Sequence, residues 1–267
     1  MDAKEIKKTA TVILAAGEGT RMNSAIPKVL HVLAGKPMIE HVLYSVMKLG
    51  CGINCVIVGF KKEQVMERLK KDGCDGKIKF VYQDPPLGSG HAVLQAEAVF
   101  KDFYGDILVT CGDMPLLKTD TFKGLINTHR SEKNAATILT ACVNDPFGYG
   151  RIITDVSGRI CGIVEEKDAS PAQKKLNVVN TGIYCFRGPE LFASLKEVRP
   201  DNKKKEYYIT DVVKIMYDKG KKTGMVGLDD IMEAAGINTP QQLAGVERYL
   251  EKAENDNRRR KKENAIR

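Results

Sequence analysis

Residues 12–22, Val-Ile-Leu-Ala-Ala-Gly-Glu-Gly-Thr-Arg-Met, join an apolar run to a glycine-rich loop, and Pro27 and Lys28 follow soon after. The apolar run predicts a buried strand. The small residues behind it let successive backbone N–H groups turn inward as a nest for an anion. Arg21 and Lys28 add full positive charges beside that nest. The stretch therefore predicts a polyphosphate site at the end of a strand.

This loop matches neither of the two commonest phosphate-binding motifs. A P-loop requires Gly, four residues and then Gly-Lys-Ser/Thr, an order that residues 17–22 lack. A dinucleotide fingerprint requires a third glycine where Met22 stands, although Glu40 lies about the right distance on to bind a ribose. A tight turn with incidental charges remains the alternative interpretation, and the pairing of Arg21 with Lys28 weighs against it.

The composition fits a globular enzyme that acts on small anions. The 267 residues are 43% hydrophobic and 28% charged, enough for one large domain or two small ones. Residues 251–267 hold seven basic and four acidic side chains, so this tail carries +3 of the formal charge of +8, and we expect it to be solvated and frayed. The remaining excess suits anionic substrates. The sequence has no basic stripe interleaved with aromatic residues, so we expect no nucleic-acid partner.

The sequence also predicts the cellular setting. No apolar run approaches the roughly 20 residues that span a bilayer, and residues 1–8 are charged and lead directly into a short strand. We therefore expect a cytoplasmic protein with no membrane partner. The seven cysteines are odd in number and include no Cys-x-x-Cys pair, which predicts reduced thiols rather than disulfides or a zinc site.

Strands and helices alternate over the first half of the chain. Apolar runs predict strands, and helical spacing of apolar residues predicts helices between them. The predicted strands are 11–15, 54–58, 78–82, 107–110 and 136–143. The predicted helices are 37–48, 61–71, 90–100 and 120–130. This alternation predicts an α/β fold of Rossmann-like type, with a mainly parallel sheet wrapped by helices. Ligands of such sheets bind at the carboxyl ends of the strands, where the loop at Gly17 falls.

The second half predicts a smaller, β-rich lobe. Residues 151–154 and 159–164 flank a hairpin turn, and 180–182 predict a second turn before a strand at 182–186. A helix is expected at 207–217, with Thr210 or Asp211 as its N-cap. We expect one catalytic domain over residues 1–245, and a helical arm with the basic tail over 246–267.

Two oxygen-bearing side chains are candidates to hold a metal ion. Asp113 follows the apolar strand at 107–110, at the same sheet edge as the loop at Gly17, and Asn238 lies in Gly-Ile-Asn-Thr-Pro. Mg²⁺ takes one or two protein ligands and completes its shell with phosphate oxygens and water. Taken alone, each residue is more typical of a turn, so the assignment depends on the neighbouring motifs.

Eight motifs occur in order along the chain: residues 14–22 with Pro27-Lys28, Gln83 with 87–92, 112–116, 148–152, 163–169, 180–182, 206–211 and 236–238. Together they closely resemble the pyrophosphorylase domain of the bacterial N-acetylglucosamine-1-phosphate uridylyltransferases, a branch of the sugar nucleotidyltransferase family. The likeness covers residues 9–250. The first motif is common to the class, whereas Gly-Tyr-Gly-Arg at 148–151 and Val-Glu-x-Lys-Asp-Ala at 164–169 indicate this branch.

The resemblance implies a reaction of UTP with N-acetylglucosamine 1-phosphate that gives UDP-N-acetylglucosamine and pyrophosphate, with Mg²⁺ as cofactor. It also implies a role for each matching residue: Leu14, Ala15, Ala16, Gly17 and Gly112 near the nucleotide, Lys28 on its phosphates, Arg21 on the transferred phosphate, Gln83, Gly88 and Ser89 on uracil, Gly150, Glu165 and Asn180 on the sugar, and Asp113 and Asn238 on the metal. The attacking phosphate oxygen is already anionic near neutral pH, so no histidine needs a catalytic role.

The sequence departs from the family in two places. Cys111 stands where the family often has tyrosine, which leaves open any contact of that ring with the ligand, and Ser89 keeps the hydroxyl of the more frequent threonine. Full-length members continue into hexapeptide repeats that transfer acetyl groups and form a trimer. Residues 251–267 contain no such repeat, so we expect uridylyl transfer without acetyl transfer and do not assume a trimer.

Three alternative functions stay open. The nearest is another sugar nucleotidyltransferase, which uses dTTP or a glucose or galactose phosphate. A nicotinamide-dependent oxidoreductase is disfavoured by Met22 and Arg21 in the loop. A non-catalytic module that binds nucleotide sugars would be expected if a metal ligand were missing, but Asp113 and Asn238 are both present.

Overall fold

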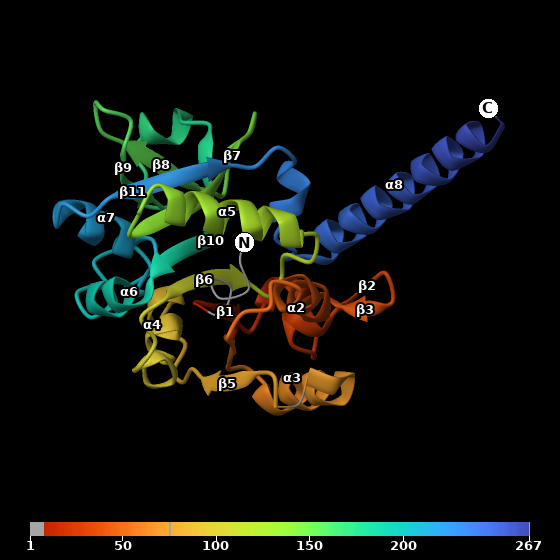
Figure 1. Cartoon of the computed structure of the whole chain (residues 1–267), viewed down its shortest axis with the longest axis horizontal. Helices are drawn as coiled ribbons and strands as arrows, with labels where there is room; N and C mark the ends of the chain where they lie inside the picture. Colours follow the sequence, from red (N-terminus) through yellow and green to blue (C-terminus); the bar gives the residue numbers. More distant parts are fainter. Residues whose placement is uncertain (1–7, 75, 267) are drawn as a thin grey trace.

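A computed structural model of the protein describes residues 8–74 and 76–266, with the backbone alone at 72, 73 and 257–266 (Figure 1). Within this part, one nine-stranded sheet organises the chain. Its strands run in the order β11-β7-β10-β6-β1-β4-β5, with β8 and β9 attached beside β10. The predicted α/β class with a mainly parallel sheet flanked by helices is confirmed.

Four strands form the parallel part of the sheet: β5 (Lys79–Tyr82), β4 (Ile53–Val58), β1 (Thr9–Ala15) and β6 (Asp106–Cys111). In register, Leu14 of β1 lies opposite Ile57 of β4 and Cys111 of β6. The carboxyl ends of these strands therefore meet at one edge. The loop at Gly17 and the segment at Asp113 both leave the sheet from that edge, as predicted.

The rest of the sheet is built around β10 (Val178–Arg187). This strand runs antiparallel to β6 on one side and to β7 (Ala136–Cys142) on the other, and β11 (Thr223–Gly227) closes the sheet parallel to β7. A strand from the second half of the chain thus separates β6 from β7, although only α5 (Thr119–Ser131) lies between them in sequence. Figure 1 shows β10 in this place between β6 and β7.

A small β-lobe extends from β10. The predicted hairpin is present as β8 (Gly150–Thr154) and β9 (Ile160–Val164), and Asn180 of β10 pairs with Gly150 of β8. The turn predicted at 180–182 is wrong. These residues lie inside β10, where the pairing with β7 shifts register between Asn180 and Ile183 and Gly182 takes a φ of 83°. The glycine therefore serves a β-bulge rather than a turn.

Helices cover both faces of the sheet because side chains alternate along each strand. Val12 of β1 packs into the core beneath α4 (Ser89–Leu94), α6 (Gly188–Leu195) and α7 (Asp211–Asp218). Its neighbour Ile13 packs into the opposite core, beneath α2 (Met38–Met47), α3 (Lys62–Leu69) and α5. The apolar positions of α2 that predict a helix are its buried face.

Several predicted boundaries change. The helix expected at 90–100 divides into α4 and a 3-10 turn, η4 (Glu97–Phe100). The helix α7 begins at Asp211 with Thr210 at its N-cap position, and within the described residues the Thr210 side chain makes no capping hydrogen bond. Sequence patterns missed α6 and β11. They also missed the small hairpin and the short helical turns: β2 (Val32–Leu33), β3 (Lys36–Pro37), η1 (Thr20–Met22), η2 (Lys28–Leu30), η3 (Lys70–Cys74), η5 (Gln173–Lys175) and η6 (Ile231–Ala234).

The C-terminal helix α8 (Pro240–Ile266) continues through the segment that we expected to fray. Val246 packs with Leu33, Met38 and Ile237, Leu250 packs against the same cluster, and beyond Leu250 the helix extends away from the body (Figure 1). The helix runs across the proposed boundary at residue 245, which stays a prediction. Side chains of the basic run 258–262 and residue 267 lie outside the described residues.

No disulfide joins the cysteines within the described residues. Among residues 8–74 and 76–266, no helix is both long enough and apolar enough to cross a bilayer.

Candidate active site

The loop after β1 folds tightly around the stem of Lys28. Gly19 adopts a left-handed φ of 69°, and a Cβ at this position would lie 2.4 Å from the Lys28 Cβ. Any other residue would force either the loop or the lysine to move. The glycine that marks this motif in the sequence therefore fixes where the lysine side chain begins.

The Lys28 ammonium lies between the two predicted metal ligands. Its Nζ donates a short hydrogen bond to Asp113 Oδ2 and another, 2.9 Å long, to Asn238 Oδ1. Arg21 Nη2 donates to the same Asn238 oxygen at 3.1 Å. Four side chains from three distant segments thus meet at one point, and this cluster contains two cations and one carboxylate.

Main-chain contacts hold the three segments together. The Gly112 N–H donates to the Leu14 carbonyl at 2.9 Å, and the Ile237 N–H donates to the Asp113 carbonyl at 2.9 Å. A side chain at Gly112 would press on Leu14, because its Cβ would lie 3.3 Å from that carbonyl oxygen. The positions of Asp113 and Asn238 relative to the loop at Gly17 are therefore set by the backbone.

Glu233 strengthens this arrangement, and sequence patterns gave no sign of it. Its buried carboxylate accepts hydrogen bonds from Lys118 Nζ at 2.6 Å and from Thr121 Oγ1 at 2.5 Å. The hydrogen bond from Lys118 to Glu233 raises the pKa of Lys118. Glu233 thereby ties the turn that precedes Asn238 to the start of α5, which follows Asp113.

The donor set at this point fits a small divalent cation. One ammonium nitrogen touches both Asp113 and Asn238, so a single cation can reach both oxygens. A carboxylate and an amide oxygen are hard ligands of the kind that Mg²⁺ prefers. Mg²⁺ takes one or two protein ligands and completes its shell with phosphate oxygens and water, so these two oxygens are sufficient. No cluster of three His, Cys, Asp or Glu side chains gathers in the described residues.

A pocket of about 260 Å³ opens beside this cluster. Nine of the predicted site residues line it: Leu14, Ala15, Ala16, Gly17, Lys28, Gln83, Gly88, Ser89 and Asp113. Gly88 has a φ of 114°, and a Cβ there would lie 2.6 Å from the Tyr207 carbonyl oxygen, so only glycine fits. Ser89 Oγ accepts the Ile209 N–H at 3.1 Å and still has its own proton to donate.

Gln83 is oriented by its neighbours in this pocket. Its Nε2 donates to the Gly88 carbonyl at 3.0 Å and lies 3.1 Å from His91 Nδ1. Burial lowers the pKa of His91, which favours the neutral ring that can accept this proton. With both N–H bonds engaged, the Gln83 Oε1 is the atom that remains to accept a hydrogen bond from a ligand.

The predicted sugar residues form a second group. A Cβ built at Gly150 would lie 3.4 Å from Glu165 Oε1 and 3.5 Å from Asn180 Cβ, so the three residues surround one small space. Asn180 Nδ2 donates to the Tyr184 hydroxyl at 2.8 Å. Burial raises the pKa of Glu165, and the nearby Asp168 carboxylate adds to the shift while Lys204 opposes it.

Cys111 connects the two groups. Its thiol lines the pocket and lies 3.9 Å from the Gly182 carbonyl, in the bulge of β10 beside the sugar residues. Burial raises the pKa of Cys111 to about 12, so the thiol is neutral. The structure therefore brings the predicted residues into two adjoining groups, with Cys111 on the wall between them.

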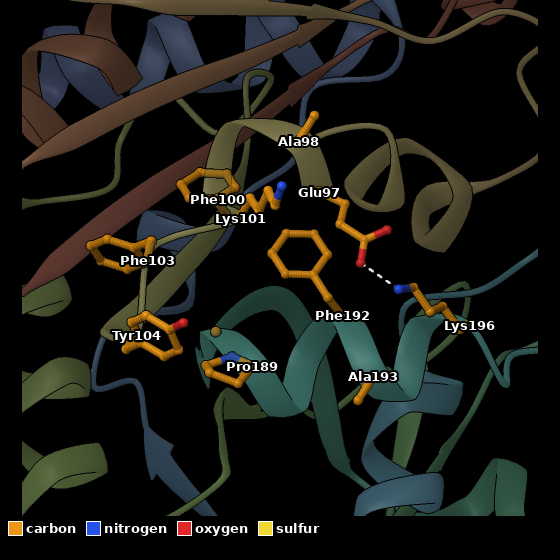
Figure 2. Close-up of a pocket in the computed structure, with 11 residues that line it drawn as sticks. Glu97, Ala98, Phe100, Lys101, Phe103, Tyr104, Pro189, Phe192, Ala193 and Lys196 are labelled. Atoms are coloured by element: carbon orange, nitrogen blue, oxygen red, sulfur yellow. Dashed lines mark ion pairs between the residues drawn. The ribbon is translucent and has the colours of Figure 1, made fainter.

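A larger pocket, of about 550 Å³, lies between η4 and α6 (Figure 2). Phe100, Phe103, Tyr104 and Phe192 form much of its lining, and its charged pair, Glu97 and Lys196, is joined at 2.5 Å. None of its described lining residues is a predicted site residue. Lys101 is a further charged residue of its lining. The smaller pocket, which nine predicted site residues line, is therefore the candidate active site.

Known proteins resemble the chain over most of its length. The Nucleotidyl transferase family model matches residues 10–254. The Bifunctional protein GlmU of Pelotomaculum thermopropionicum is 45% identical over 241 residues, 90% of this chain and 52% of that protein. The Bifunctional protein GlmU of Syntrophotalea carbinolica is 44% identical over 248 residues, 93% of this chain and 52% of that protein. The chain thus spans about half the length of these relatives.

A solved structure also shares the fold. The crystal structure of UDP-glucose pyrophosphorylase complexed with UDP-glucose matches with a TM-score of 0.72, and the match covers 92% of this chain and 99% of that chain. The sequences are 20% identical, so this likeness concerns the fold alone.

Proposed function

The chain belongs to the nucleotidyl transferase family, and on that premise we propose that it transfers the uridylyl group of UTP to N-acetylglucosamine 1-phosphate. The observation that carries this proposal is the meeting of Lys28, Arg21, Asp113 and Asn238 at the mouth of a pocket floored by the loop at Gly17. The positively charged side chains of Lys28 and Arg21, beside a glycine-rich loop, can bind the phosphates of a nucleoside triphosphate.

The pocket supports recognition of a uracil base. Gln83 Oε1 is an acceptor, and uracil offers a donor at N3, whereas cytosine has an acceptor there. Gly88 and Ser89 stand beside Gln83 in the same wall. A cytosine would leave the buried glutamine oxygen unpaired, which costs about 1–3 kcal/mol. The proposed base preference is therefore UTP or dTTP over CTP.

The sugar phosphate needs no general base in the proposed reaction. One of its anionic oxygens attacks the α-phosphorus of UTP, a new P–O bond forms, and the bond from that phosphorus to the bridging oxygen breaks as pyrophosphate leaves. What the chain must supply is in-line positioning of two anions and neutralisation of the charge that spreads over both. Lys28 and Arg21 are placed for this work.

Asp113 and Asn238 would hold Mg²⁺. When bound, the ion supplies positive charge to the phosphate oxygens and polarises them. Lys28 Nζ donates to Asp113 Oδ2 and Asn238 Oδ1, so an ion held by these two oxygens would take the place of its ammonium, which would then face the phosphates.

The sugar end would bind N-acetylglucosamine through Gly150, Glu165 and Asn180. A side chain at Gly150 would press on Ile163, since its Cβ would lie 3.1 Å from Ile163 Cγ2, and the Glu165 carboxylate can accept hydrogen bonds from sugar hydroxyls. Both substrates are small and anionic, and we place the reaction in the cytoplasm, where the sequence features predict the protein to be.

A pyrophosphate-release panel tests this function. Purified protein with Mg²⁺ is given UTP, dTTP, CTP or GTP against N-acetylglucosamine, glucose and galactose 1-phosphates. We expect the highest kcat/KM with UTP and N-acetylglucosamine 1-phosphate. A higher value with dTTP or with glucose 1-phosphate would assign the chain to another sugar nucleotidyltransferase. Binding of UDP-N-acetylglucosamine without any pyrophosphate release would indicate a binding module.

A further inference from the structure

The Gly-Tyr-Gly-Arg motif at 148–151 ends in an arginine that the proposed function does not use. Arg151 is 1% exposed, although its side chain is long and charged. Gly150 faces the sugar residues, and Arg151 follows it in β8, so its side chain leaves on the opposite face of the strand. Arg151 therefore does not contact the sugar, and its burial calls for another explanation.

Three hydrogen bonds join the Arg151 guanidinium to separate segments. Nη2 donates to Glu166 Oε2 at 2.7 Å and to the Lys174 carbonyl at 3.3 Å, and Nη1 donates to the Tyr149 carbonyl. Glu166 directly follows Glu165 in sequence. One side chain thus ties β8 to both ends of residues 165–175, the segment that begins with the sugar-site carboxylate.

The ion pair is reinforced on the Glu166 side. The Glu166 carboxylate is 17% exposed, and Lys174 Nζ lies 3.4 Å from its second oxygen. These partners, Arg151 first, hold the pKa of Glu166 below its ordinary value. A planar guanidinium with several donors suits such a junction better than a lysine, which presents a single point charge.

We propose that Arg151 is a positioning residue for the sugar-phosphate end of the site, which holds Glu165 at its distance from Gly150 through Glu166 and the 165–175 segment. This inference rests on the proposed function. It separates two roles within one motif: Gly150 provides space for the sugar, and Arg151 fixes the wall opposite that space. Arg151 donates its three hydrogen bonds to Tyr149, Glu166 and Lys174 and none to the residues at the nucleotide end, so the binding of UTP should not depend on it.

Two measurements on the full chain test the inference. Arg151→Met removes the donors and keeps the length of the side chain, and Glu166→Gln weakens the same junction with less risk to folding. Arg159→Met is the matched control, because Arg159 lies on the same hairpin but is 54% exposed and pairs with Asp155 instead. Steady-state kinetics give KM for each substrate, and hydrogen exchange of the free protein reports the backbone of 165–175.

We expect Arg151→Met to raise KM for the sugar phosphate on the order of tenfold, with KM for UTP within about twofold. Exchange in 165–175 should accelerate while β1 and β6 stay protected. Glu166→Gln should give the same pattern, weaker, and Arg159→Met should give neither change. A fall in kcat alone, or an equal rise in both KM values, would show a merely structural role and overturn the inference.

Folding and function can be separated in this design. If Arg151→Met does not fold, the Glu166→Gln pattern decides alone. If the unaltered protein releases no pyrophosphate, the proposed function fails, while unchanged exchange in 165–175 of the variants would overturn the positioning role independently.

Discussion

The two ends of the candidate site differ in how their charged groups are arranged. At the nucleotide end Lys28 and Arg21 both donate to Asn238, and Lys28 also donates to the Asp113 carboxylate. At the sugar end burial raises the pKa of both Glu165 and Asp211, and the Asp168 carboxylate adds to both shifts while Lys204 opposes the shift of Glu165. The first end therefore presents two converging cations to phosphates, whereas the second presents carboxylates that can accept hydrogen bonds from a neutral ring.

Removing the carboxylate at the nucleotide end should have the largest effect. Asp113→Ala leaves two cations without their counter-charge and removes a proposed metal ligand. We expect kcat to fall on the order of 10²–10³-fold, the range for loss of one preorganised electrostatic contact. Pyrophosphate release measures it, and Asp120→Asn, whose side chain is 89% exposed, serves as the control. Turnover close to that of the unaltered protein would mean that the phosphates bind elsewhere.

Loss of the central cation comes next. Lys28→Met keeps the stem that packs on Gly19 and deletes the ammonium, so the loop should stay in place while charge neutralisation is lost. We expect kcat/KM to fall on the order of 10²-fold. Lys36→Met, at an exposed lysine of β3, should leave it unchanged. A variant of Lys28 as active as the control would remove the main support for the proposed phosphate site.

A change at the sugar end should alter KM for the sugar phosphate alone. Glu165→Gln keeps the shape of the side chain but weakens its acceptance of hydroxyl protons. We expect KM for the sugar phosphate to rise about tenfold with KM for UTP unchanged, the signature of lost uniform binding. Glu63→Gln, at an exposed glutamate of α3, is the control. If both KM values moved together, the two ends could not be treated as separate.

The raised pKa at the sugar end also predicts a pH dependence of stability. Burial, with Asp168 nearby, raises the pKa of Asp211 to about 6, above its unfolded value near 3.9. The folded state then holds the proton more tightly, so stability falls as pH rises from about 4 to about 6. Asp211→Asn should gain on the order of 1 kcal/mol at pH 7 after allowance for partial exposure, and nothing at pH 3.

Thermal unfolding at both pH values measures this difference. A gain that is equal at pH 3 and pH 7 would show that the ionisation of Asp211 is not its cause.

The smallest effect is expected in the aromatic pocket of Figure 2. Tyr104 lines this pocket and is 82% exposed, and none of the described lining residues is a predicted site residue. Tyr104→Ser should keep kcat and both KM values within about twofold, because surface substitutions away from a site change little. A selective change in one KM would extend the functional surface beyond the two ends compared here.

Local signals predict the nucleotide end well. Gly19 has a left-handed φ and no room for a Cβ beside Lys28, and both requirements are visible in the sequence as a glycine in a short loop. The strand before it is apolar because it is covered on both faces. The meeting of Asp113 with Asn238, by contrast, could be predicted through resemblance alone, since 125 positions separate them in sequence.

Long-range contacts explain what the sequence patterns missed. Asn180 was predicted in a turn because Asn-Thr-Gly is typical of turns, but its place in β10 depends on pairing with β7 and β8. Glu233 and Arg151 act through partners that are remote in sequence or hidden on the far side of a strand. The predictions of domain boundaries and of missing acetyl transfer remain predictions.

The insertion of β10 between β6 and β7 has a consequence for how the chain matures on the ribosome. When residues up to Cys142 have emerged, β6 and β7 exist but the strand that joins them does not, because it begins at Val178. Each then presents an open edge, which is a template for pairing with other chains. Synthesis of β10 covers the edges of β6 and β7 that face each other, and β7 keeps a second open edge until β11 pairs with it.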